Sequence, residues 1–123
     1  MGYSLGDDKK SFDIFDETCK RFKLVCDELE KRNWLYDKNK YSFTKNNRTL
    51  KLELDQDHIE SIYIYDNSIN WEKFCKNNFM YEPIYNNYNQ IECVEFLLSS
   101  KTDINRFINK IEQAELNEKE FEL

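Results

Sequence analysis

The chain has 123 residues, a length that fits one domain and leaves no room for a second independent hydrophobic core. Hydrophobic residues (40%) and charged residues (34%) together exclude a disordered chain, and two glycines and one proline exclude flexible linkers and glycine-rich phosphate-binding loops. With 24 acidic against 18 basic residues the net charge is -6, which disfavours direct binding of nucleic acid and suits attraction to a basic protein.

The location and redox state of the protein follow from what the sequence lacks. The first residues hold no basic and apolar signal segment, and no apolar run approaches the roughly 20 residues that span a bilayer. We therefore expect a cytoplasmic protein without membrane contact. The cysteines form no CxxC pair and fall at apolar positions, so we expect reduced, structural thiols and no metal or cofactor: Cys19, Cys26, Cys75 and Cys93.

The first predicted element is a long amphipathic helix that begins at Ser11. Its apolar residues recur at steps of three and four, and its other positions carry charges. This stripe consists of Phe12, Phe15, Cys19, Phe22, Cys26 and Leu29. Asn33 and Trp34 end the pattern. Residues 1–10 before the helix are expected to fray.

The period then changes to two, which predicts three strands in succession. Tyr41 and Phe43 alternate with polar residues, and Asn46-Asn47 follow as a turn. The second strand covers Leu50–Leu54, residues 55–57 form the next turn, and the third strand covers Ile59–Tyr65. Short turns between these strands predict an antiparallel meander.

The second half of the chain predicts a short helix, a strand and a last helix. Asn70 caps the short helix, whose apolar face carries Trp71, Phe74 and Cys75. Residues 79–89 have no clean period. A fourth strand follows at Ile91–Leu98, and then a helix capped by Thr102 or Asp103 with Ile104, Phe107, Ile108 and Ile111 inward. Residues 117–123 are expected to fray.

These elements predict an α+β fold in the order α-β-β-β-(short α)-β-α. A four-stranded antiparallel sheet carries the two long amphipathic helices, N-terminal and C-terminal, on one face. The other face would present Lys51, Glu53, Ser61, Tyr63, Tyr65 and Glu95.

No catalytic site is evident. The single histidine, His58, lies next to Asp57, but neighbouring strand residues point to opposite faces, and the cysteines lie on apolar faces. Acidic side chains crowd this hairpin end, and they could in principle hold a divalent cation or act as acid and base: Glu53, Asp55, Asp57 and Glu60. Because an Asp-rich turn is also the ordinary way to end a strand, we predict no metal site and interpret the carboxylates as an anionic binding patch.

Tyrosines are the second candidate for a binding surface. Tyr81, Tyr85 and Tyr88 are interleaved with asparagines, a mixture of rigid aromatic anchors and adaptable amides that is typical of interfaces. The alternative is a loop whose tyrosines pack on the sheet edge. Tyr63 and Tyr65 on the open sheet face favour the interface.

The whole profile predicts an acidic inhibitor that binds a basic protein partner. The favoured version is an immunity protein that neutralises a bacterial toxin, most simply a basic nuclease, by occluding its active site. One alternative is a phage-encoded inhibitor that mimics nucleic acid and blocks a nucleic-acid-targeting defence complex. Others are a small enzyme with an unfamiliar site around Asp55, Asp57 and His58, and a self-associating adaptor. We expect a monomer or a weak homodimer.

Overall fold

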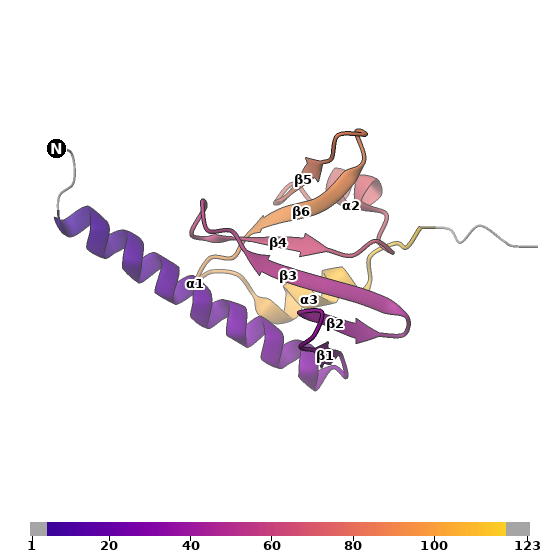
Figure 1. The fold of residues 1–123 in the computed structure, drawn as a ribbon, viewed down its shortest axis with the longest axis horizontal. Coiled ribbons are helices and arrows are strands. Elements are labelled where there is room, and N and C mark those ends of the chain that lie inside the picture. The colour runs from indigo at the N-terminus through magenta and orange to yellow at the C-terminus, as the bar shows by residue number, and fades with distance from the viewer. Residues whose placement is uncertain (1–4, 118–123) are drawn as a thin grey trace, which may run out of the picture.

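The computed structural model describes residues 5–117, which form an antiparallel sheet of six strands with helices on one of its faces (Figure 1). In chain order the elements are α1 (Leu5–Lys31), β1 (Leu35–Asp37), β2 (Ser42–Lys45), β3 (Arg48–Leu54), β4 (Ser61–Tyr65), α2 (Trp71–Asn77), β5 (Tyr81–Tyr85), β6 (Ile91–Leu97) and α3 (Ile104–Glu112). The strand order is β1-β2-β3-β4-β6-β5. The predicted α+β class is confirmed, with two strands more than expected.

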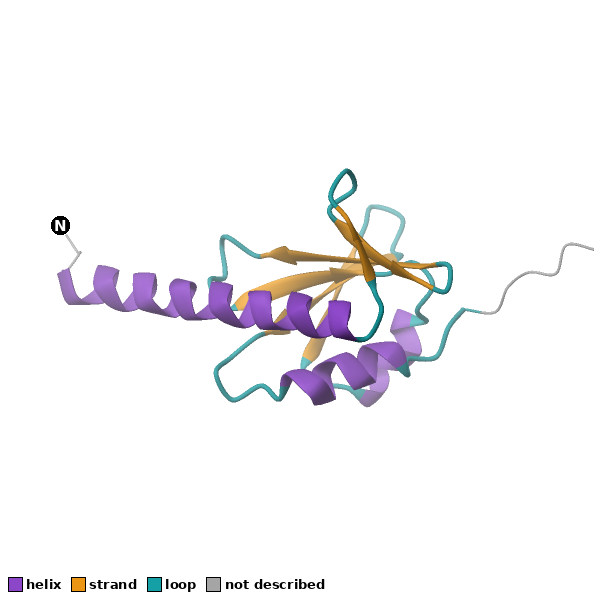
Figure 2. Cartoon of the chain, turned by 90° about the horizontal axis from the view of Figure 1, so that it is seen from below, coloured by secondary structure: helices purple, strands orange, loops and turns teal. Residues whose placement is uncertain are grey.

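The helices cover one face of the sheet and bury their apolar stripes there, as Figure 2 shows. α1 contributes Val25 and Leu29, while α2 contributes Trp71 and Phe74. The sheet faces them with a continuous layer of buried apolar side chains: Phe43, Leu50, Leu52, Ile62, Ile64, Val94, Phe96 and Leu98. The opposite sheet face carries no helix from the described part of the chain. None of the helices in residues 5–117 combines the length and apolar character needed to cross a membrane.

α1 starts at Leu5, before the predicted Ser11, and ends where the sequence predicts. Asn33 adopts a φ of 71°, a left-handed conformation that asparagine tolerates better than most residues. The amide of Trp34 donates to the carbonyl of Leu29 (3.0 Å), and the amide of Asn33 donates to the carbonyl of Glu30 (3.0 Å). These two bonds form a Schellman motif, which pairs carbonyls that the last helical turn leaves open.

The predicted meander is confirmed in β2, β3 and β4. Asn46 and Asn47 join β2 to β3 with φ angles of 51° and 66°, as a two-residue type I′ hairpin requires. In the β3–β4 pair, Leu52 lies opposite Ile64 in the core. β4 begins at Ser61 and not at the predicted Ile59, because residues 56–60 form a turn.

Two strands were not predicted. β5 occupies the tyrosine-rich segment, with Tyr81 opposite Phe96 and Glu82 opposite Glu95. Pro83 is tolerated because β5 is an edge strand, where one side of the backbone has no ladder partner. β1, at the other edge, has three residues, too few for an alternating pattern to be visible in the sequence.

α3 is shorter than the long helix that the sequence predicts, because it ends at Glu112 after nine residues. Asp103 caps it: its carboxylate accepts a hydrogen bond from the amide of Arg106 (3.2 Å). The chain then turns back, and Leu116 forms a bridge with Ile69. Most of the predicted frayed end (118–123) and residues 1–4 lie outside the described residues.

Glu112 joins α3 to α1 and to the β2–β3 hairpin. Its carboxylate accepts hydrogen bonds from Arg32 (2.7 Å), Lys45 (3.1 Å) and the indole of Trp34 (3.1 Å). Burial alone would raise the pKa of Glu112, but the hydrogen bonds from Arg32, Lys45 and Trp34 outweigh burial and lower that pKa.

Asp66, which directly follows β4, is also paired with a basic side chain. Its carboxylate is 1% exposed and accepts a hydrogen bond from Arg48 Nη2 (2.9 Å). The same Arg48 nitrogen donates to the carbonyl of Ile111 (3.1 Å), near the end of α3. The fold therefore places a basic side chain beside each of these two carboxylates.

Candidate functional site

The carboxylate of Asp55 organises the turn between β3 and β4. Its Oδ1 accepts hydrogen bonds from the amides of Asp57 (2.9 Å) and His58 (3.1 Å), and its Oδ2 lies 2.8 Å from Nδ1 of His58. The Asp55 side chain is 2% exposed, whereas the His58 ring is 69% exposed. Asp55 is therefore no part of an accessible anionic patch, which corrects the interpretation drawn from the sequence. The reason is that its oxygens are needed to pair the amides of the turn.

Glu95 reaches the same carboxylate from the neighbouring strand β6. It lies opposite Tyr63 of β4, and its Oε2 is 3.6 Å from Nδ1 of His58. The hydrogen bond with Asp55, partial burial and the negative charge of Asp55 raise the pKa of Glu95 to about 7. The Glu95 carboxyl group therefore binds a proton more readily than an exposed glutamate does.

The other groups around Asp55 keep it ionised. Burial would raise the pKa of Asp55, but hydrogen bonds from Glu95, His58, Tyr63 and the amide of Asp57 outweigh burial and lower that pKa. The hydrogen bond to Asp55 raises the pKa of Tyr63 to about 12, so its phenol stays a donor. Hydrogen bonding to Asp55 also raises the pKa of His58. Such an arrangement can exchange a proton or hold a cation.

The rest of this helix-free face is partly occupied by internal contacts. Glu53 pairs with Lys51 (2.9 Å), and Lys51 lies 5.7 Å from the ring centroid of Tyr65. Tyr63 and Tyr65 lie on this face, as predicted, and both are half-buried. Of the other predicted acidic residues, Asp57 is exposed and Glu60 is half-buried.

All four thiols are free, and one of them is buried. Cys93 is 3% exposed and points to the face opposite that of Val94, where Tyr65 hydrogen-bonds it. Burial raises the pKa of Cys26 to about 11, and burial also raises the pKa values of Cys75 and Cys93. Protonated thiols are poor nucleophiles at neutral pH, which argues against cysteine catalysis at these positions.

The structure separates the three tyrosines of the β5 region. Tyr81 is 4% exposed and packs between aromatic core residues, its ring centroid 4.5 Å from that of Phe96, so it is not available to a partner. Tyr85 and Tyr88, in contrast, are 58% and 83% exposed at the β5–β6 hairpin. Alternation alone would place Tyr81 and Tyr85 on the same face, but the β5–β6 register shifts between Ile84 and Tyr85, and Tyr88 lies in the turn beyond β5.

Two exposed apolar residues were missed by sequence reasoning. Phe79 is 91% exposed and Met80 is 64% exposed, in the turn between α2 and β5. Phe79 and Tyr85 line one groove of about 460 Å³, together with Glu72, Lys76 and Glu82. We call the exposed rings along the β5 edge the tip surface: Phe79 and Tyr85, which share this groove, and Tyr88 in the hairpin that follows β5. The sequence signal for this exposure was the position of Phe79 and Met80 directly after the predicted short helix.

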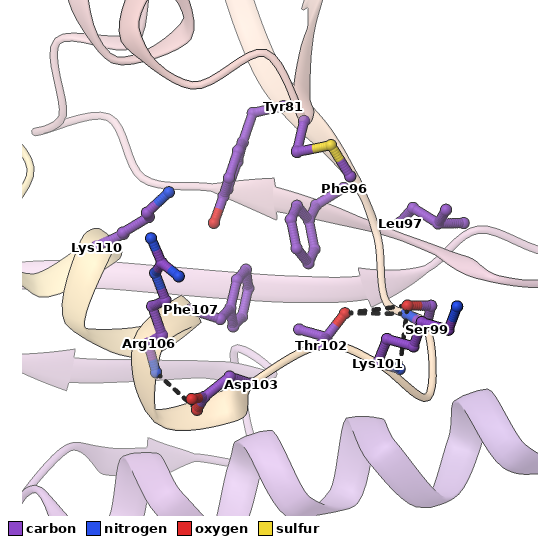
Figure 3. Close-up of a pocket in the computed structure, with 11 residues that line it drawn as sticks. Tyr81, Phe96, Leu97, Ser99, Lys101, Thr102, Asp103, Arg106, Phe107 and Lys110 are labelled. Carbon is purple, nitrogen blue, oxygen red and sulfur yellow. Dashed lines mark hydrogen bonds between the residues drawn. The ribbon is translucent and has the colours of Figure 1, made fainter.

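A second groove of about 470 Å³ lies between the end of β6 and α3 (Figure 3). Phe96 and Phe107 stack at its centre with ring centroids 4.7 Å apart, next to the buried Tyr81. Its rim is basic, with Lys101 in the loop after β6 and with Arg106 and Lys110 on α3. This rim contrasts with the acidic character of the whole chain.

Comparisons with protein-family models, with curated proteins and with solved structures gave no match for this chain.

Proposed function

We propose that the protein is an acidic protein-binding inhibitor, and specifically an immunity protein that neutralises a basic bacterial toxin by covering its active site. The observation that carries this proposal is the tip surface. Phe79 and Tyr88 are 91% and 83% exposed, although the core of this small chain already contains a stacked aromatic cluster. Large aromatic rings that a core does not need are typical anchors of protein interfaces.

The tip surface has the composition of an interface centre with a polar rim. Tyr85 combines a large apolar ring with a hydroxyl that can donate to a partner. Glu72 and Glu82, both exposed, flank the groove that Phe79 and Tyr85 line, and Lys76 adds one positive charge. Carboxylates around aromatic anchors favour lysine and arginine side chains on the partner, and a net charge of -6 adds long-range attraction.

Isolation of the partner tests this function. The full chain, expressed from its native neighbourhood, should copurify with a basic protein at a stoichiometric ratio. That protein should stop growth when it is expressed alone, and coexpression of this chain should restore growth. A partner that is harmless alone, or a chain that associates only with itself, would contradict the proposal.

Substitution of the tip tyrosines then tests the surface. We expect Tyr85→Ala and Tyr88→Ala each to speed dissociation from the partner at least about fivefold, because loss of an anchor costs about 1 kcal/mol or more. Tyr41→Ala is the matched control, since Tyr41 is 70% exposed but belongs to the β1–β2 region at the other edge of the sheet. Dissociation rates measured by surface plasmon resonance decide. Equal effects at positions 41, 85 and 88 would remove the tip surface from the interface.

A further inference from the structure

Three possible metal ligands converge at the β3–β4 turn, which lies near the end of β6 that is far from the β5–β6 hairpin (Figure 1). Asp55 follows β3, His58 belongs to the turn, and Glu95 comes from β6. One donor atom of each lies within 4.8 Å of the other two. The His58 Nδ1 atom is 2.8 Å from Asp55 Oδ2 and 3.6 Å from Glu95 Oε2.

The two distances from His58 are close to the spacing of donor atoms in a metal site. Zinc binds imidazole nitrogen and carboxylate oxygen at about 2.0–2.2 Å, so the ligand atoms of a tetrahedral site lie about 3.4 Å apart. The distances from His58 Nδ1 to the two carboxylates lie on either side of that value. Asp55 is fixed by the amides it pairs, while the exposed ring of His58 can adjust.

The charge around the cluster is an independent indication. Glu112 and Asp66, the other carboxylates that the described fold holds in buried contacts, each have arginine or lysine beside them. Among the described residues that pair with Asp55 and Glu95, the one group that can carry positive charge is His58. In addition, Glu82 lies directly opposite Glu95 in the β5–β6 register, and like charges in that position repel. Glu112 and Asp66 thus have arginine or lysine beside them, whereas the Asp55–Glu95 pair has only the exposed His58.

We propose that Asp55, His58 and Glu95 bind one divalent transition-metal ion, with zinc as the preferred ion. An imidazole among the ligands favours zinc or a similar ion over calcium and magnesium, which prefer oxygen ligands alone. Three protein ligands leave a coordination position for water or for a side chain of a partner. The site does not depend on the proposed function, since it shares no residue with the tip surface.

Zinc binding to the full-length protein tests the site. Titration calorimetry with zinc chloride in a buffer that does not chelate metal should show one ion per chain. His58→Gln and Glu95→Gln should each weaken binding by at least about tenfold, because even the loss of an outer partner of a ligand has that effect. Asp57→Asn is the control, because Asp57 is exposed and adjacent but contributes no ligand atom to the cluster.

The four cysteines require a second readout, because thiols also bind zinc. Cobalt replaces zinc in such sites, and a thiolate ligand would add an intense charge-transfer band that oxygen and nitrogen ligands lack. We expect cobalt binding without that band, and its loss in His58→Gln. Glutamine at position 95 can still donate a hydrogen bond to Asp55, and His58 is exposed, so we expect at least one of the two variants to stay folded. Circular dichroism checks the folding of each variant. Equal zinc affinity in wild type and His58→Gln, no binding, or a thiolate band would overturn the proposal.

Discussion

At the scale of single residues, the position of a carboxylate in the fold decides its role. Asp55 and Glu112 are both withdrawn from solvent and both have lowered pKa values, but Asp55 pairs with backbone amides and His58, whereas Glu112 pairs with Arg32 and Lys45. The sequence shows an acidic side chain in each case and does not show these partners. Glu112 is thus a stability residue that links three elements.

Replacement of Glu112 by glutamine tests this role. Breaking a buried ion pair costs about 3–5 kcal/mol, and since Glu112 is 23% exposed we expect a loss of about 2 kcal/mol in the free energy of unfolding. Urea denaturation at pH 7 measures it. Glu115→Gln is the matched control, because the Glu115–Lys73 pair is exposed on both sides and should contribute little. A similar loss in both variants would contradict the assigned role.

The pH dependence of Glu112→Gln adds a second check. The pKa of Glu112 is lowered in the folded protein, so its contribution is complete above the unfolded value of roughly 4.3 and is lost as the pH falls through the folded pKa. The stability difference between wild type and variant should therefore shrink on acidification below about pH 4. A difference that stays constant to pH 2 would show that the loss at position 112 is one of packing.

At the scale of elements, the strongly periodic segments were predictable and the edges were not. The stripe from Phe12 to Leu29 and the alternation from Leu50 to Tyr65 each predict one buried face. In the structure, α1 buries its apolar face from Val25 onward, and β3 and β4 each bury one face. β5 was missed because a proline and several Tyr and Asn residues hide its alternation, which only pairing with β6 makes favourable. The contact between Asp55 and Glu95 depends on that same long-range register, so sequence reasoning could name Asp55 but not its partner.

The end of α1 provides a prediction at this scale. Asn33 holds a left-handed conformation in the Schellman motif. Asn33→Ala should lower the free energy of unfolding by about 1 kcal/mol, because a Cβ-bearing side chain without a local hydrogen bond is disfavoured there. Asn33→Gly should be as stable as wild type or more so, since glycine adopts this conformation freely. Thermal unfolding of the two variants decides, and equal losses would mean that the Asn33 side chain and not its backbone matters.

At the scale of the whole molecule, charge and shape act together. The proposed interface combines a net charge of -6 with a local rim of Glu72 and Glu82 at the tip surface. Reversal of these two charges to lysine should slow association with the basic partner severalfold at low salt and reduce its salt dependence. The same reversal at Glu17 and Asp27, exposed on α1, gives an equal net charge. Stopped-flow association rates that fall equally in both pairs would indicate that only the net charge matters.

The two edge strands of the sheet limit how this protein can bind a partner and how its binding surface can evolve. β1 is three residues long and β5 carries Pro83, so neither edge offers a long run of open backbone groups for another strand to join. Recognition of any partner must then depend on side chains and not on main-chain ladders. Side chains can be exchanged one at a time without altering the fold. A family of such proteins could therefore diverge in partner choice through a few surface substitutions while the scaffold stays constant.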